Sequence, residues 1–157
     1  QGKAYDPIDA LDQLYDRREV GRSVTVGLDK TEVKIGKGKL TFRVHSEKPG
    51  YLYILMVGTD KNHIYLLFPR PGWTMTAGGP PGINHFVALV SDHPRDFSKI
   101  ELTKAGAFSE FSAAKVESML RSSSGDSAVL AGTPRCKSTE DCSSAYGAAK
   151  FSIAEVN

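Results

Sequence analysis

Two strand-sized apolar runs, joined by a short polar link, dominate the hydrophobic pattern of this chain. Residues 50–68 read Gly-Tyr-Leu-Tyr-Ile-Leu-Met-Val-Gly-Thr-Asp-Lys-Asn-His-Ile-Tyr-Leu-Leu-Phe, and residues 58–62 form the link. Continuous apolar runs of this length, bounded by turn residues, are typical of strands covered on both faces. The run therefore predicts a buried hairpin inside a layered, β-rich body, and it carries no catalytic motif.

Alternating or apolar segments predict further strands along the chain. Lys34 to Lys39 carries Gly36 and Gly38 and predicts a turn between two of them. In the last segment, Phe151 and Ile153 are expected to face inward while Lys150 and Ser152 face outward. The predicted strands cover residues 24–28, 39–45, 85–90 and 148–156, with a short extended piece at 73–76.

Two segments have helical signals. Residues 7–20 begin with Asp6 as a cap and Pro7 at the first helical position, and apolar residues follow at spacings of three and four until Gly21. Residues 112–121 follow a possible Ser112 cap and predict a second helix. The remainder, up to Ala145, is expected to be loop.

Together these elements predict a mainly β (α+β) fold, a β-sandwich of about six or seven strands with two flanking helices. With 157 residues and 40% hydrophobic content, the chain fits one domain that buries about two thirds of its unfolded surface. We expect a single domain over residues 1–157: helix 7–20, β core 22–102, helix 112–121, and a disulfide loop with the final strand at 134–157.

Charge and hydropathy exclude some classes of function. Lys and Arg number 20 against 18 Asp and Glu, a net charge of +2 that is small and scattered along the sequence. This balance does not indicate a nucleic-acid-binding surface. No apolar stretch reaches the roughly 20 residues that a membrane-spanning helix needs.

The two cysteines, Cys136 and Cys142, lie in a polar segment without a second cysteine pair or a nearby histidine. This arrangement does not favour zinc. A disulfide closing the loop would contribute roughly 2 kcal/mol to stability, and it would indicate an oxidising compartment. The alternative is two unpaired surface thiols.

Four strings resemble a bacterial family, the domain of unknown function four-three-eight-four. They are Val33-Lys-Ile-Gly-Lys-Gly-Lys-Leu-Thr-Phe-Arg-Val, Pro49-Gly-Tyr-Leu-Tyr-Ile-Leu, Tyr65-Leu-Leu-Phe-Pro69 and Gly82-Ile-Asn-His-Phe-Val-Ala-Leu-Val-Ser-Asp92, within residues 24–100. The flanks resemble the longer version of this domain that follows membrane-anchored serine/threonine kinases. The resemblance implies a periplasmic domain, tethered to the inner membrane outside this chain and linked to type VI secretion.

One segment departs from the family pattern. Relatives carry an Asn-rich insert after the Leu-Leu-Phe-Pro string, whereas here Pro69 is followed directly by Arg70 and Pro71. Prolines one residue apart favour extended backbone and resist a tight reversal. We therefore expect a break in the ordered chain, or an omitted loop, near Arg70.

Several residues invite a functional interpretation, each with a structural alternative. The glycines of Gly78 to Gly82 lack the Lys-Ser or Lys-Thr of a phosphate loop, so a strand connection is expected. Ser91, Asp92 and His93 are adjacent and so cannot form a catalytic relay. His63, His85 and His93 could form a metal site with Asp60, Asp92 or Asp96; the alternative is that these histidines are scattered over the surface. Trp73 could be an exposed anchor for a partner; the alternative is that it fills the end of the core.

We therefore predict no catalytic residue, no metal and no cofactor, and a candidate binding surface of Arg70, Trp73 and His93. The favoured function is a non-catalytic periplasmic sensing or protein-interaction domain with a protein partner in the cell envelope and no nucleic-acid partner. The alternative is a module for a small ligand or cell-wall fragment, with a pocket formed by the Trp73 loop, the Gly78 to Gly82 loop and the loop near His93. The sequence leaves the oligomeric state open.

Overall fold

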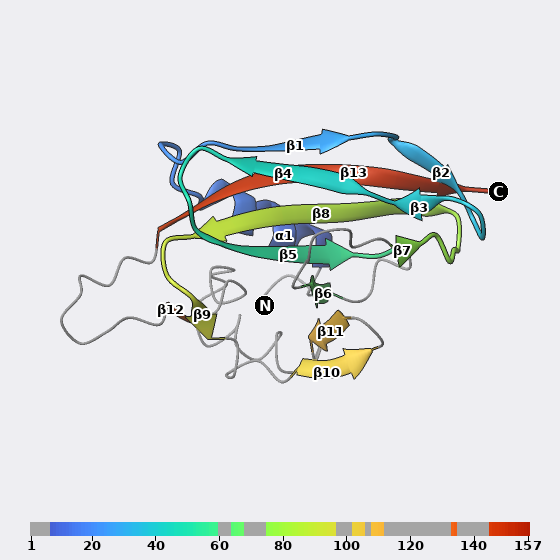
Figure 1. Cartoon of the computed structure of the whole chain (residues 1–157). Helices are drawn as coiled ribbons and strands as arrows, with labels where there is room; N and C mark the ends of the chain where they lie inside the picture. Colours follow the sequence, from blue (N-terminus) through green and yellow to red (C-terminus); the bar gives the residue numbers. More distant parts are fainter. Residues whose placement is uncertain are drawn as a thin grey trace.

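A seven-stranded sheet forms the centre of the molecule in the computed structural model (Figure 1). The structure describes residues 7–59, 64–67, 75–96, 102–105, 108–111, 133–134 and 145–157. Within these described residues the sheet order is β10-β11-β6-β5-β8-β13-β2, and only the β13–β2 pair is parallel. The strands are β2 (Glu32–Lys34), β5 (Tyr51–Val57), β6 (Ile64–Leu67), β8 (Gly82–Ser91), β10 (Leu102–Ala105), β11 (Phe108–Phe111) and β13 (Tyr146–Val156).

The two strands predicted within residues 50–68 are present and pair with each other. β5 pairs antiparallel with β6, with Val57 opposite Ile64 and Ile54 opposite Leu67. On its other edge β5 pairs with β8 over seven residue pairs, and β8 pairs with β13 over ten. Residues 53–57 of β5 and 86–91 of β8 are all buried, because both faces of these strands are covered.

Helix α1 (Pro7–Asp16) covers one face of the sheet. Its apolar side, Leu11 and Leu14, is almost fully buried in a cluster with Leu55, Leu89 and Tyr146. The helix is shorter than the predicted 7–20. After Asp16 the chain turns toward the sheet, and the Glu19 N–H donates to the Tyr146 carbonyl at 2.7 Å, a bond that a continuing helix would not make.

A two-stranded ribbon of β1 (Val24–Leu28) and β4 (Phe42–Ser46) covers the opposite face. Its inward side chains join a second apolar cluster with residues of β5, β8 and β13. Phe86 and Phe151 stack with ring centroids 4.7 Å apart, and Phe42 of the ribbon lies 5.0 Å from Phe151. The described part of the chain thus has three layers: ribbon, central sheet and helix.

Two further short pairs lie at opposite ends of the molecule in Figure 1: β3 (Lys39–Leu40) with β7 (Met75–Thr76), and β9 (Arg95–Asp96) with β12 (Thr133–Pro134). The predicted strand 39–45 is therefore wrong as one element. It divides at Thr41, because β3 pairs with β7 whereas β4 pairs with β1.

The mainly β class is confirmed, as are strands at 24–28, within 82–91 and within 146–156. Ile153 is buried while Lys150 and Ser152 are exposed, as predicted. The predicted count of six or seven strands was too low, since the central sheet alone has seven. The short strands β2, β9, β10, β11 and β12 were not predicted. β2 and the β9–β12 pair depend on segments distant along the chain, whereas β10 pairs with its neighbour β11 across two residues. The predicted helix 112–121 lies outside the described residues. Among those residues, no helix is both long and apolar enough to cross a membrane.

Candidate functional site

The predicted site residues have different outcomes. Arg70, Trp73, Cys136 and Cys142, together with the Pro69–Arg70 junction, lie outside the described residues. His93 is described and half-buried, just beyond the end of β8. Its backbone carbonyl accepts a hydrogen bond from the Ser91 hydroxyl at 2.7 Å.

The predicted pocket of three loops is wrong. Gly82 begins β8 and Ser91 ends it, so the Gly78 to Gly82 loop and the His93 loop lie at opposite ends of one strand (Figure 1). At roughly 3.3 Å per residue the strand separates them by about 30 Å. His85 and His93 are separated in the same way, and among the described residues no three His, Cys, Asp or Glu side chains are grouped to hold a metal ion.

Ser91, Asp92 and His93 lie where the chain turns at the end of β8, and their hydrogen bonds hold that turn in place. The Ser91 hydroxyl donates to a backbone carbonyl, and the Asp92 carboxylate accepts two hydrogen bonds from the Arg22 guanidinium. That hydrogen bonding lowers the pKa of Asp92 and raises the pKa of Arg22. The pair connects the segment after α1 to the end of β8.

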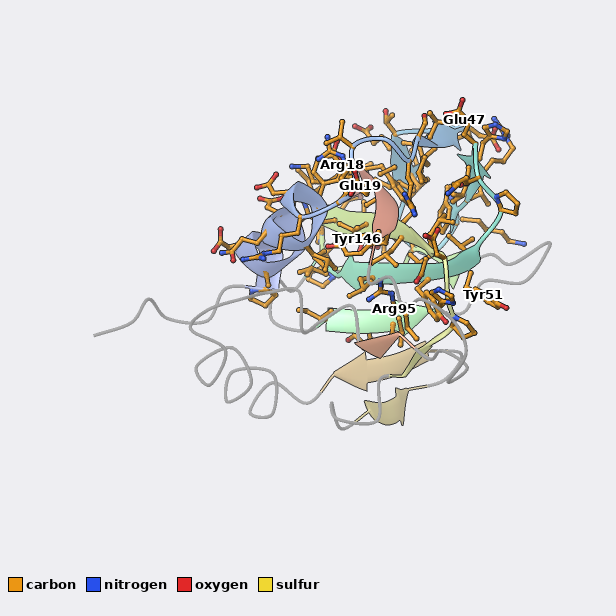
Figure 2. The ribbon with its side chains drawn as sticks, turned by 90° about the vertical axis from the view of Figure 1, so that its left-hand side faces the viewer. Arg18, Glu19, Glu47, Tyr51, Arg95 and Tyr146 are labelled. Atoms are coloured by element: carbon orange, nitrogen blue, oxygen red, sulfur yellow. The ribbon has the colours of Figure 1, made fainter. Side chains whose placement is uncertain are left out.

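A buried arginine occupies the same end of the sheet. Arg95 is 7% exposed, its backbone N–H donates to the Tyr53 hydroxyl at 2.8 Å, and its Nε donates to the Ser91 hydroxyl at 2.8 Å. Its guanidinium carbon lies 5.2 Å from the centre of the Tyr146 ring, on the face of the sheet that carries α1 (Figure 2). Burial lowers the pKa of the Arg95 guanidinium. These contacts hold β9 against the sheet.

A surface hollow at the other end of the molecule is lined mainly by charged side chains. It encloses about 570 Å³ beside the outer edge of β2. Two apolar residues are among its lining: Val33, which is 5% exposed, and Val156 at the end of β13. The lining consists of Asp29, Lys30, Glu32, Val33, Lys34, Lys37, Gly38, Lys39, Thr41 and Val156.

A tight turn between β2 and β3 fixes the shape of this hollow. Gly36 has a φ of +81°, a conformation that glycine adopts readily, and its N–H donates to the Ala77 carbonyl at 2.7 Å. The Gly38 N–H donates to the Lys34 carbonyl at 2.7 Å. A Cβ at Gly38 would lie 2.6 Å from the Cβ of Val33, so only glycine fits there without movement of the backbone.

The charge around the hollow is predominantly positive. Four lysines, Lys30, Lys34, Lys37 and Lys39, face two carboxylates, and all four are exposed. One of the carboxylates, Asp29, is bound by Arg43 at 2.7 Å. Within the described part of the chain, the other ion pairs are Arg22–Asp92 and Lys150–Asp12, so none of them involves these four lysines. The excess of two positive charges around this hollow equals the net charge of the whole chain.

This arrangement can bind an anion through several ammonium groups at once. The sequence did not predict this site, because the charged residues are scattered along the chain, although Lys34-Ile-Gly-Lys-Gly-Lys39 predicts a turn. The available signal was lysine at alternating positions around two glycines. This signal does not show that Val156, at the end of the last strand, lies beside the lysines and lines the same hollow.

Comparison with known proteins adds no relative: no family model, no curated protein and no solved structure matches this chain. The family resemblance drawn from the four sequence strings stays a prediction.

Proposed function

We propose that this chain is a non-catalytic binding domain that recognises an anionic protein partner at the lysine-lined hollow. One observation carries the proposal: four exposed lysines surround a single hollow whose backbone is held by a tight glycine turn. Charges gathered around a concave surface raise the local concentration of an oppositely charged partner. A rigid backbone also reduces the entropy that binding would otherwise cost.

The chemistry of the lining favours binding over catalysis. The lining side chains provide ammonium groups, two carboxylates, one hydroxyl and two valines, with no histidine or cysteine among them. Nucleophilic catalysis by a hydroxyl or thiol needs a base within hydrogen-bonding reach. The polar groups at the far end, Arg95, Ser91 and Asp92, are engaged in holding loops on the sheet.

The cellular setting follows from the resemblance and is part of the proposal. We place the domain in the periplasm, tethered to a membrane-anchored serine/threonine kinase associated with type VI secretion, where binding of an envelope protein would report to the kinase. The alternative of a small-ligand module loses its predicted location, since two of its three loops lie at opposite ends of β8.

The proposal is tested with a fluorescein-labelled octaglutamate peptide and fluorescence anisotropy. We expect binding that weakens between 50 and 300 mM NaCl, because exposed charges are screened. The double variant Lys34→Ala/Lys37→Ala should bind about two- to thirtyfold more weakly, because each exposed charge pair contributes about 0.2–1 kcal/mol.

Lys48→Ala is the matched control. Lys48 is an exposed lysine beyond the far end of β4, so its removal changes the net charge without touching the hollow. It should leave the affinity within about twofold of the parent chain. The single variant Lys34→Ala removes the same charge from the hollow. Equal weakening of probe binding by Lys48→Ala and Lys34→Ala, or no binding by the parent chain, would contradict the proposed site.

A further inference from the structure

We infer that the partner presents an extended acidic peptide segment that adds as a strand to the open edge of β2, with its carboxylates among the lysines. This inference rests on the proposed function and specifies how the hollow is occupied. Three observations support it: the edge of β2 that no described strand covers, lysines on both faces of that edge, and outward backbone groups at a spacing that a peptide backbone matches.

The edge of the sheet is open at β2. Among the described residues, this strand is the last in the sheet order and pairs only with β13. The Ala154 N–H donates to the Thr31 carbonyl at 2.9 Å, and the Ile35 N–H donates to the Val156 carbonyl at 2.8 Å. In a parallel ladder these bonds direct the odd-numbered residues of β2 toward β13.

The even-numbered residues therefore direct their backbone groups away from the sheet. The Lys34 carbonyl accepts the Gly38 N–H of the glycine turn. The N–H and carbonyl of Glu32 and the N–H of Lys34 point outward at the hollow. A peptide backbone offers a donor and an acceptor at matching spacing, as in strand addition to other sheet edges.

Lysines flank this edge on both faces. The side chain of Val33 points into the ribbon-side apolar cluster, so the side chains of Glu32 and Lys34 lie on the opposite face. Gly38, between Lys37 and Lys39, lies against the Cβ of Val33 and so on the Val33 face. A partner strand with acidic side chains on either of its faces would therefore place them near an ammonium group. The carboxylate of Glu32 would repel an acidic side chain placed directly beside Glu32.

The same features have a protective interpretation. Short edge strands with charged side chains resist edge-to-edge association of proteins. Protection by lysines works against neutral or basic strands, and an acidic strand reverses the sign of the interaction. The edge is thus selective, and the sign of the charge decides which segments it admits.

The test uses the peptide acetyl-Glu-Thr-Glu-Thr-Glu-Thr-Glu-amide and the same peptide methylated on alternate backbone nitrogens. The charges are identical, but methylation blocks pairing on one edge. Two methylated forms, one for each set of alternate residues, cover both registers. We expect at least one form to bind fivefold or more weakly. The unmethylated peptide should slow amide hydrogen exchange of Glu32 and Lys34 at least tenfold at saturation.

A matched pair of variants tests the edge from the side of the protein. Glu32→Pro removes the outward N–H, while Glu32→Ala removes the same charge and keeps the N–H; proline is tolerated on the outward side of edge strands. Peptide binding should be lost in the proline variant and retained in the alanine variant. Circular dichroism checks that both variants fold, and the methylated peptides give the answer independently if the proline variant does not.

The outcomes separate this inference from the proposed function. If both methylated forms bind like the parent peptide and no exchange protection appears, the strand-addition inference is overturned, while lysine-dependent binding still supports an anion-binding function. Preference for inorganic tripolyphosphate or for phosphatidylglycerol vesicles over the peptide would also overturn it. If no anion binds, the proposed function fails as well.

Discussion

At the scale of single residues, the buried polar groups of this protein fasten loops to the central sheet. The Glu155 carboxylate accepts the Gly79 N–H at 2.8 Å and the Asn84 amide at 2.6 Å, which holds the Gly78 to Gly82 loop beside β13. Arg95 and Tyr53 do the same for β9 at the other end. Among the described residues, no buried side-chain nitrogen or oxygen lacks a hydrogen-bond partner. Such groups are costly to leave unpaired, so each loop has a fixed position.

The Arg22–Asp92 pair gives a prediction about pH. Hydrogen bonding from Arg22 lowers the pKa of Asp92 below its ordinary value of about 3.9. The pair therefore stabilises the fold above that value, and the contribution is lost as pH falls through the lowered pKa. We expect Asp92→Asn to cost about 1 kcal/mol at pH 7, since both side chains are about four-fifths covered.

Urea unfolding of the parent chain and Asp92→Asn at pH 7 and pH 2 measures this effect. The difference in unfolding free energy should be smaller at pH 2 than at pH 7, because the contribution of the carboxylate is lost as pH falls toward and through its lowered pKa. A difference that stays the same at both values of pH would show that the asparagine acts through packing and not through the lost charge.

At the scale of elements, the turn between β2 and β3 decides the shape of the candidate site. The turn is held by the Gly36 N–H to the Ala77 carbonyl and by the Ala77 N–H to the Gly38 carbonyl at 2.9 Å, which connect it to the segment after β7. The backbone on both sides of Lys37 is therefore held by hydrogen bonds to Ala77. A change that moves this backbone should alter both stability and binding.

Gly38→Ala tests the turn. The added Cβ would lie 2.6 Å from the Cβ of Val33 and 2.9 Å from the backbone nitrogen of Lys34, so the turn must shift. We expect a loss of about 1–3 kcal/mol in unfolding free energy and weaker binding of the octaglutamate probe.

Gly78→Ala is the matched control for this variant, because a Cβ there meets nothing within 4 Å. Its unfolding free energy should stay within about 0.5 kcal/mol of the parent chain. Urea unfolding and probe anisotropy measure both variants. Unchanged probe binding by a folded Gly38→Ala variant would show that the conformation of this turn does not determine binding.

At the scale of the whole molecule, one sheet serves two apolar clusters. α1 covers the cluster around Leu55 and Leu89, and the β1–β4 ribbon covers the cluster around Phe86. Because alternate residues of β5 and β8 belong to opposite clusters, neither layer can separate without exposing a face of the same strands. The three layers are expected to unfold together.

Leu14→Ala and Ile153→Val test this coupling from the two faces. Leu14 is 0% exposed in the helix-side cluster, and Ile153 is 1% exposed in the ribbon-side cluster. We expect losses of about 2–4 and 0.5–1.5 kcal/mol respectively. In urea, helix and sheet signals in circular dichroism should keep coincident transitions in both variants. An early loss of the helix signal alone in Leu14→Ala would show that α1 unfolds independently.

The sequence by itself determined the class of fold and its centre. The run at 50–68 gave the β5–β6 hairpin, and apolar or alternating segments located β1, β8 and β13. These elements are predictable because a strand buried on one face has alternating apolar residues, and a strand buried on both faces has a continuous apolar run. Either pattern is visible within a short stretch of sequence. The turn at Lys34 to Lys39 was predictable for the same local reason, since its glycines lie within the segment.

Only the tertiary structure decided how these pieces meet. β2 has one buried residue, Val33, and forms because it pairs in parallel with the end of β13, more than a hundred residues away. The pairing of β3 with β7 divides a continuous alternating segment at Thr41. The length of β8 separates the two loops that were expected to share a pocket. The lysines are near one another in sequence, but the hollow that they line together with Val156, and the edge of β2 beside it, exist only once the final strand has paired.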